Sequence, residues 1–252
     1  PSPLTLFVRD PCLFIASYLY TYRPPISPPP LSSKRIRIVC ISDTHNLQPD
    51  VPDGDVLIHA GDLTVNGTFS ELRGQIDWLK SLPPKCKIAV AGNHDVCLNE
   101  AHMSRQRERE RERERERARG KIGKIVAVRN EESDWGLVMY LQNATSTISL
   151  PHKNRTLRIY ASPMTPRYGN WAFQYTPEKD IWRGVVPEKT HVPVTHGPPL
   201  AHLDFTDTYR AGCPHLLREM WRVKPRLHVF GHVHRAKGVE VLDWGWVQRG
   251  YD

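Results

Sequence analysis

Short apolar runs recur along the chain, and five of them stop at a glycine or at a cluster of polar residues. The clearest covers residues 87–91 and is followed by a glycine and then by Asn93, His94 and Asp95. The five runs cover residues 37–41, 56–60, 87–91, 192–195 and 227–230. Short β-branched runs bounded by glycine or proline are typical of buried strands in a layered α/β sheet. Because ligands collect beyond the carboxyl ends of such strands, we expect the polar residues there to lie together.

The polar residues at these strand ends have the chemistry of metal ligands. They are Asp43, His45, Asp62, Asn93, His94, His196, His232 and His234. Carboxylate, amide and imidazole donors without a thiolate suit Mn, Fe or Zn, and one carboxylate such as Asp62 can bridge two ions about 3.5–4 Å apart. In an extended chain Asp43 and His45 would point the same way, so both could bind one ion. His232 and His234 share this spacing.

A helix is predicted between the second and third of these strands. Thr68 and Glu71 form a capping box, and apolar residues follow at helical spacing until Pro83 and Pro84 close the helix. The helix and its flanking strands make a βαβ unit. We expect a second helix over 214–222 and further strands over 135–141, 156–161, 239–242 and 246–247.

Three segments differ in composition from the predicted core. Residues 24–33 are rich in proline, so we place an N-terminal extension at 1–34 and one domain at 35–252. Residues 4–22 are apolar, but Arg9, Asp10 and Pro11 interrupt them and leave only about ten apolar residues in a row, short of the ~20 that a membrane-spanning helix needs. They also lack the basic region of a secretory signal. Residues 105–119 alternate arginine with glutamate, which we interpret as a solvated, mostly disordered insertion in the domain.

Composition argues against several functional classes. The net charge is +8, but residues 105–119 contribute +3 of it, and the remainder is too small to predict a nucleic-acid groove. The five cysteines are an odd number without a Cys-x-x-Cys pair, which argues against a disulfide framework and a thiolate zinc site. A reducing compartment is the simpler interpretation, and we expect a cytoplasmic protein.

Taken in order, the polar strand ends resemble a known family. The motifs are Asp43-x-His45, Gly61-Asp62, Gly92-Asn93-His94-Asp95, His196-Gly197 and Gly231-His232-x-His234. Over about 35–234 they resemble the calcineurin-like metallophosphoesterase superfamily. Stretches such as DGDVLIHAGDLT, KIAVAGNHD and VTHGPPL resemble its branch of metallophosphoesterase domain-containing proteins, which is related to class III cyclic-nucleotide phosphodiesterases.

The resemblance implies a fold and a cofactor. The implied fold is a four-layer α/β/β/α sandwich. The implied cofactor is a pair of divalent metal ions, with Mn favoured and Fe, Zn or Mg as alternatives. One ion would be held by Asp43, His45 and His234. The other would be held by Asn93, His196 and His232, with Asp62 bridging the two ions.

The resemblance also implies a reaction on a phosphodiester, for example a cyclic nucleotide. A hydroxide bridging the two metals would attack phosphorus in line while the metals neutralise the phosphoryl oxygens. His94 would stabilise the transition state or protonate the leaving group, and Asp95 would orient His94. Trp171 and Phe173 would stack a nucleobase, in a stretch similar to the Asn-Trp-Gly-Phe of this branch with Ala172 in place of glycine.

Three other functions stay open at this point. A phosphomonoesterase would use the same residues on a different substrate. A catalytically weak nucleotide-binding or scaffold protein would bind nucleotide without metal-dependent turnover. A nucleic-acid binder acting through the basic run would show an affinity that falls steeply with salt and survives Asp62→Ala. The partner that we expect is a small phosphoester or nucleotide substrate rather than nucleic acid, and we expect no membrane-spanning segment.

Overall fold

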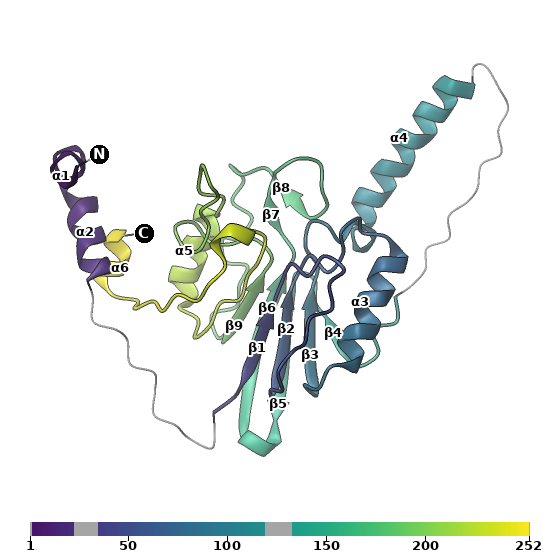
Figure 1. Cartoon of the computed structure of the whole chain (residues 1–252), viewed down its shortest axis with the longest axis horizontal. Helices are drawn as coiled ribbons and strands as arrows, with labels where there is room; N and C mark the ends of the chain where they lie inside the picture. The colour runs from purple at the N-terminus through teal and green to yellow at the C-terminus, as the bar shows by residue number, and fades with distance from the viewer. Residues whose placement is uncertain (1, 23–34, 119–132, 252) are drawn as a thin grey trace.

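Two β-sheets lie face to face at the centre of the molecule (Figure 1). The computed structural model describes residues 2–22, 35–118 and 133–251. The first sheet has four parallel strands in the order β1 (Ile38–Ile41), β2 (Val56–Ala60), β3 (Cys86–Val90) and β4 (Val138–Tyr140). The second has the order β5 (Ala144–Leu150), β6 (Arg155–Ser162) and β9 (Val192–Thr195), with β6 antiparallel to β5 and parallel to β9.

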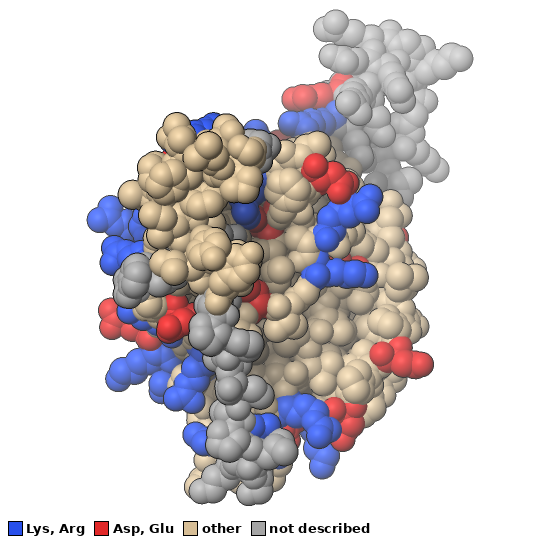
Figure 2. All heavy atoms as spheres, turned by 60° about the vertical axis from the view of Figure 1, so that its left-hand side comes forward, with Lys and Arg blue, Asp and Glu red and all other residues tan. Residues whose placement is uncertain are grey.

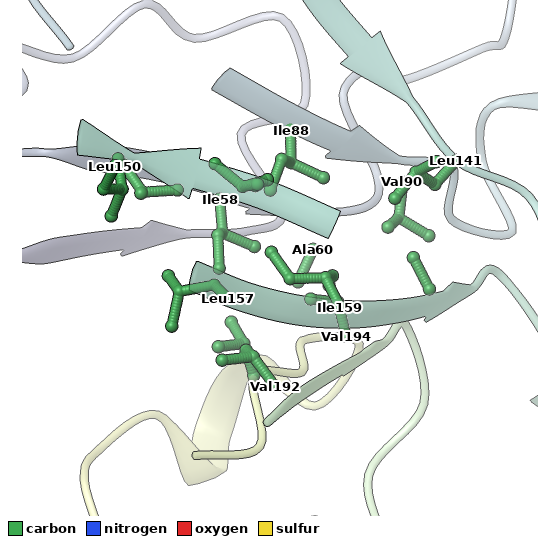
Figure 3. Close-up of a cluster of buried hydrophobic side chains, with 14 residues drawn as sticks. Ile58, Ala60, Ile88, Val90, Leu141, Leu150, Leu157, Ile159, Val192 and Val194 are labelled. Carbon is green, nitrogen blue, oxygen red and sulfur yellow. The ribbon is translucent and has the colours of Figure 1, made fainter. Parts of the chain in front are cut away.

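The core between the sheets follows from the alternation of side chains along each strand. Ile58 of β2 and Ile88 of β3 enter it from the first sheet. Ile159 of β6 and Val194 of β9 meet them from the second sheet (Figure 3). Since neighbouring residues of a strand face opposite sides, Leu57 lies on the outer face of the first sheet, where it is equally buried. Both faces of this sheet are therefore covered, as continuous apolar runs in parallel strands predict.

The first outer layer is α3 (Phe69–Ser81), which lies against the outer face of the first sheet (Figure 1). Trp78 of α3 belongs to the same buried cluster as Leu57. The helix begins at the predicted capping box, which is confirmed. The Thr68 hydroxyl accepts a hydrogen bond from the Glu71 N–H at 3.2 Å, and the Glu71 carboxylate accepts one from the Thr68 N–H at 3.0 Å.

The second outer layer is α5 (Pro214–Val223), which covers the opposite side of the sandwich. Its buried residues Leu216 and Met220 pack in one cluster with Tyr160, which faces outward from β6. The layers therefore follow the order helix, sheet, sheet, helix. The predicted four-layer α/β/β/α fold is confirmed.

Shorter elements connect or flank these layers. They are η1 (Val96–Leu98), η2 (Pro151–Lys153), β7 (Thr165–Pro166), β8 (Gln174–Tyr175) and η3 (His234–Ala236). Two N-terminal helices, α1 (Pro3–Arg9) and α2 (Pro11–Thr21), pack against each other, and α2 lies beside the C-terminal helix α6 (Trp246–Tyr251) (Figure 1). Among the described residues, no helix combines the length and apolar character needed to cross a bilayer. On the face shown in Figure 2, Lys and Arg side chains are interspersed with Asp and Glu.

The segment of alternating arginine and glutamate differs from its prediction. We interpreted residues 105–119 as mostly disordered, but residues up to Ala118 form part of α4 (Glu100–Ala118), which projects from the sandwich (Figure 1). Both residue types have high helix propensity, which favours the helix even though the alternation puts opposite charges three residues apart and like charges four residues apart, so that the charge pairs nearly cancel. The Asn99 side chain also caps the first turn by accepting from the His102 N–H at 2.9 Å. The proline-rich stretch 24–33 lies outside the described residues.

The strands predicted near the C-terminal end are mostly wrong. Residues 239–242 form no strand, and Val239 is 93% exposed. Residues 246–247 begin α6 instead. Of residues 227–230, Val229 alone pairs with another strand, through a bridge to Val194. A β-branched run becomes a strand only where a neighbouring strand satisfies its backbone, and no strand of the described chain pairs with 239–242.

Candidate metal centre

Loops that follow different strands are hydrogen-bonded to one another at one end of the sandwich. In the loop after β1, the Asp43 N–H donates to the Gly61 carbonyl at 2.9 Å, and the His45 N–H donates to the Asp62 carbonyl at 3.1 Å. The His232 N–H donates to Asp43 Oδ1 at 2.9 Å, although 189 residues separate the two in sequence. These backbone contacts place side chains from distant parts of the chain next to one another.

Four of the predicted metal ligands have a left-handed backbone. The φ angles are 53° at Asp43, 45° at His45, 54° at Asp62 and 72° at His232. Residues with a Cβ rarely adopt this conformation, which costs on the order of 1–3 kcal/mol each and persists where the surrounding structure enforces it. The chain is therefore not extended at Asp43 and His45, contrary to our prediction, nor at His232. The strain at these positions is typical of a functional site.

The first group of ligand atoms comes from Asp43, His45 and His234. All three donor atoms lie within 4.8 Å of one another. The Nε2 atoms of His45 and His234 are 3.2 Å apart, and His234 Nε2 is 3.4 Å from Asp43 Oδ1. These separations suit neighbouring ligands of one ion, because two donors about 2.0–2.2 Å from a metal lie about 3–3.6 Å apart.

The second group comes from Asp62, His196 and His232, whose donor atoms also lie within 4.8 Å of one another. His196 Nε2 is 3.3 Å from Asp62 Oδ2 and 3.1 Å from Asn93 Oδ1, so Asn93 adjoins this group. Asp62 Oδ2 is also 3.8 Å from His45 Nε2, which belongs to the first group. One carboxylate oxygen therefore lies between the two groups. His232 belongs to this second group and His234 to the first. The two histidines therefore do not bind the same ion, although they are only two residues apart in the chain.

The histidines are oriented as metal ligands by backbone carbonyls. His45 Nδ1 lies 3.1 Å from the Thr64 carbonyl, and His196 Nδ1 lies 2.9 Å from the Ala60 carbonyl. A carbonyl can only accept, so Nδ1 carries the proton in both rings and the neutral ring keeps a lone pair on Nε2. In both cases Nε2 is the atom that faces the other donors. The donor set, its spacing and its orientation fit divalent metal ions.

The electrostatics of the cluster also favour a bound cation. Burial acts to raise the pKa of Asp62, but the adjoining His196 ring and the His94 N–H hold it below its ordinary value. Burial acts to lower the pKa of His196, but the Asp62 and Asp43 carboxylates outweigh it and raise that pKa to about 9. Burial lowers the pKa of His232 to about 4. In the absence of metal a proton on His196 thus balances the buried carboxylates, and a divalent ion would take over this task.

His94 lies at the edge of the cluster with its ring held in place. Its Nδ1 is 2.7 Å from the Val65 carbonyl, so this atom carries the proton of the neutral ring and Nε2 is left for other contacts. A ring nitrogen of His94 lies within 4.8 Å of donor atoms of His45 and Asp62. The His94 N–H also donates to Asp62 Oδ1 at 2.8 Å. His94 is therefore next to both candidate metal groups.

The Asp95 carboxylate bonds to groups other than the His94 ring, and its predicted role of orienting His94 stays a prediction. Its carboxylate is completely buried and accepts hydrogen bonds from the N–H groups of Leu63, Thr64 and Gly92 at 2.8–3.2 Å, and from the Thr64 hydroxyl at 2.7 Å. Burial, together with the nearby Asp62 carboxylate, raises the pKa of Asp95 to about 6. Asp95 thus ties the loop after β2 to the loop after β3, and the Val65 carbonyl orients the His94 ring.

The two predicted base-stacking residues have unlike surroundings. Phe173 is 4% exposed and packs in a cluster with Ala91 and Ala172, so its ring has no open face for a nucleobase. Trp171 is 36% exposed, and its indole stacks on the His94 ring with centroids 4.0 Å apart. Contact of Trp171 with substrate stays a prediction. No sequence pattern indicated its contact with His94, because the two residues are far apart in the chain.

Sequence reasoning also missed several residues that support the site. The Ser42 hydroxyl donates to the Asp43 carboxylate, and Thr64 binds Asp95. Ser42 could have been found from its place beside Asp43 in the same motif. The backbone carbonyls of Ala60, Thr64 and Val65 could not have been identified from the sequence, because every residue type has a backbone carbonyl.

Comparison with known proteins identifies relatives of the whole described sandwich. The family described as calcineurin-like phosphoesterase matches residues 36–236. Metallophosphoesterase domain-containing protein 1 of Homo sapiens is 37% identical over 211 residues, which cover 81% of this chain and 62% of that protein. A UPF0046 protein of Caenorhabditis elegans is 36% identical over 217 residues, covering 84% of this chain and 68% of that protein.

A third relative is a much longer protein. Probable rhamnogalacturonate lyase C of Emericella nidulans is 38% identical over 250 residues, which cover 98% of this chain but 22% of that protein. The chain therefore spans less than two thirds of both this protein and the human relative. The name of the Emericella protein applies to that whole protein, and this chain matches only 22% of it.

Proposed function

The chain belongs to the calcineurin-like phosphoesterase family, and from this membership we propose that it is a metal-dependent hydrolase of phosphoesters. The finer proposal is that the substrate is a phosphodiester, such as a cyclic nucleotide. The diester is what the resemblance of the motifs to a branch related to class III cyclic-nucleotide phosphodiesterases implies. A phosphomonoesterase is the alternative that the same site would allow.

The position of Asp62 is the observation that carries the proposal. Its Oδ2 atom lies 3.8 Å from His45 Nε2 in one group of donors and 3.3 Å from His196 Nε2 in the other. A carboxylate shared by two sets of oxygen and nitrogen donors is the arrangement expected where two ions act on one phosphoryl group. Asp62 is 2% exposed, and a charge buried to this extent requires a partner of opposite sign.

Each side chain of the site would have one task. We propose that one ion is held by Asp43, His45 and His234, and the other by Asn93, His196 and His232, with Asp62 contacting both. Two divalent ions, when bound, would lower the pKa of the attacking water and neutralise the negative charge of the phosphoryl oxygens. The metals that suit this donor set are Mn, Fe, Zn or Mg, with Mn favoured.

His94 is the proposed proton donor to the leaving group. Its ring is next to both groups of ligands but is bonded through Nδ1 to the Val65 carbonyl, so Nε2 is the atom that would contact the substrate. Because the carbonyl keeps the Nδ1 proton, Nε2 can donate only when the ring is cationic. Proton donation by a positioned side chain contributes on the order of 10²–10⁴-fold to the rate.

The test is hydrolysis of bis-p-nitrophenyl phosphate by the purified protein with EDTA, Mn, Mg or Zn. We expect activity that requires metal, is lost in Asp62→Ala and falls about 10²–10⁴-fold in His94→Ala. Asp50→Ala and His152→Ala are matched controls, because Asp50 is exposed and His152 lies at the opposite end of β6 from the site. A folded, metal-loaded protein without activity on this diester or on p-nitrophenyl phosphate would refute the proposal. Faster turnover of the monoester would favour a phosphomonoesterase, and a screen of cyclic nucleotides would follow a preference for the diester.

A further inference from the structure

The contact between Trp171 and His94 gives the indole a task in the proposed reaction. The two rings are stacked, with centroids 4.0 Å apart and planes inclined by 29°. The His45 ring meets His94 edge-on from another direction, with centroids 4.8 Å apart. Together with the hydrogen bond from Nδ1 to the Val65 carbonyl at 2.7 Å, these contacts restrain one edge and one face of the His94 ring.

The loop that carries Trp171 is itself fixed to the segment that carries His94. The Ala172 N–H donates to the Asn93 carbonyl at 3.1 Å, directly beside His94 in the chain. Ala172 is 1% exposed and packs in one cluster with Ala91, the residue that follows β3. The Trp171 N–H donates to the Gln174 side chain at 3.3 Å. The backbone that carries the indole is therefore fixed to the backbone next to His94.

We propose that Trp171 is a positioning residue that holds the His94 ring in its proton-donating orientation, an inference that rests on the proposed phosphoesterase activity. The hydrogen bond to Val65 restrains Nδ1 alone, so without the indole the ring could swing about this bond and carry Nε2 away from the leaving group. A proton donor must be within hydrogen-bond reach of its acceptor, and small displacements lower the rate steeply. Trp171 thus acts through His94, whether or not it also contacts the substrate.

The kinetic test compares two diesters that differ in leaving group. Phenolate is a more basic leaving group than p-nitrophenolate, so hydrolysis of diphenyl phosphate depends more on proton donation than hydrolysis of bis-p-nitrophenyl phosphate. In Trp171→Ala we expect kcat for diphenyl phosphate to fall about 10- to 100-fold, part of what a proton donor contributes. The loss for bis-p-nitrophenyl phosphate should be smaller, with KM unchanged for both. Trp171→Phe keeps an aromatic face and should restore most of the loss. Tyr168→Ala, in the same loop and 66% exposed, is the matched control.

A double mutant separates positioning from other roles. If Trp171 acts through His94, the variant lacking both side chains should be no slower than His94→Ala. Additive losses would overturn the proposal. So would a rise in KM at unchanged kcat, which indicates a contact with substrate, or equal losses on both diesters accompanied by a lower Tm, which indicates a purely structural role.

Nuclear magnetic resonance of the metal-free protein provides a measurement independent of activity. The ring current of a stacked indole shifts the His94 Cε1–H signal upfield, and this shift should disappear in Trp171→Ala and remain in Tyr168→Ala. An unshifted His94 signal in the wild type would overturn the proposal. A wild type that shows the shift but has no metal-dependent hydrolysis would overturn the proposed function, and the role of Trp171 with it. An active wild type whose kcat is unaffected by Trp171→Ala would overturn the role of Trp171 alone.

Discussion

The buried carboxylate of Asp95 accepts two hydrogen bonds from Thr64, one from its backbone N–H at 2.9 Å and one from its hydroxyl at 2.7 Å. Thr64 follows β2 and Asp95 follows β3, so the pair joins the two loops that carry Asp62 and His94. The same carboxylate accepts from the Gly92 N–H at 2.8 Å. Asp95 is therefore the acceptor that sets the distance between these loops, even though its side chain makes no hydrogen bond to His94 in the structure.

Replacing Asp95 should destabilise the whole fold as well as the site. In Asp95→Ala, the N–H groups of Leu63, Thr64 and Gly92 lose their buried acceptor. An unsatisfied buried polar group costs about 1–3 kcal/mol, and loops that relax recover part of it. We expect the free energy of unfolding in urea to fall by at least about 3 kcal/mol. The exposed Asp50→Ala should change it by less than about 0.5 kcal/mol. Equal stability of the two variants would contradict this role of Asp95.

Divalent metal should stabilise the protein through Asp62. An ion that binds the folded state alone stabilises it by about 2.7 kcal/mol at one hundred times its Kd. For a chain of this length that corresponds to a rise in Tm of roughly 5–10 °C. Asp62→Asn keeps the shape but removes the charge between the two donor groups, and we expect it to abolish most of the rise caused by Mn. Thermal unfolding with Mn and with EDTA measures the effect, with Asp50→Asn as control. An undiminished rise in Asp62→Asn would show that the ions bind elsewhere.

Acid should destabilise the metal-free protein through two histidines outside the candidate ligands. Burial lowers the pKa of His59 to about 4 and that of His228 to about 3. In the unfolded chain both would titrate near 6.5, so below that pH the unfolded state binds more protons than the folded state. The contribution of these two histidines to stability therefore falls as the pH decreases from about 6.5 towards 4, and it exceeds the opposite contribution of Asp95, whose raised pKa favours the folded state over part of this range. In EDTA, urea titrations between pH 7 and 5 should show this fall, and its slope should be smaller by about 1 kcal/mol per pH unit in His228→Gln. An unchanged slope would mean that His228 is protonated in the folded protein.

The sequence predicted those parts of the fold whose signals are local. An apolar run between glycine or proline residues marks β2 and β3, and the box of Thr68 and Glu71 marks the start of α3. β5 was missed because its residues Ala144–Leu150 are largely threonine and serine, with Ile148 and Leu150 as its buried residues. It forms a strand because β6 pairs with it along its whole length. Conversely, residues 239–242 have strand-like composition but no such partner.

The sequence indicates which residues form the candidate site, but not how their side chains and backbone are oriented. Asp62 and His196 were identified because each follows an apolar run, and the shared end of the sheets brings them together. The left-handed backbone at Asp43 and His232 could not be predicted, since non-glycine residues rarely adopt it and the surrounding loops impose it. Nor could the stacking of Trp171 on His94, which depends on how a distant loop folds against β3.

Replacing each of two glycines by alanine tests the close packing at the site, because one of them lies against candidate ligands and the other does not. A Cβ added at Gly92 would overlap Asp62 Oδ1 and approach the His196 ring, so both candidate ligands would have to move. We expect Gly92→Ala to lower the free energy of unfolding by about 1–3 kcal/mol, the usual cost of overpacking. It should also weaken the binding of Mn in a calorimetric titration.

The matched control is Gly74→Ala in α3. A Cβ added at Gly74 meets no atom within 4 Å, and the residue is exposed on the helix. Alanine is a better helix former than glycine by about 0.8–1.0 kcal/mol, so this variant should be more stable than the wild type and should bind Mn unchanged. The same substitution is thus expected to have opposite effects on stability at the two positions. If Gly92→Ala were as stable as the wild type and bound Mn equally well, Asp62 and His196 would not need the close approach of the Gly92 backbone, and the donor geometry described above would be wrong.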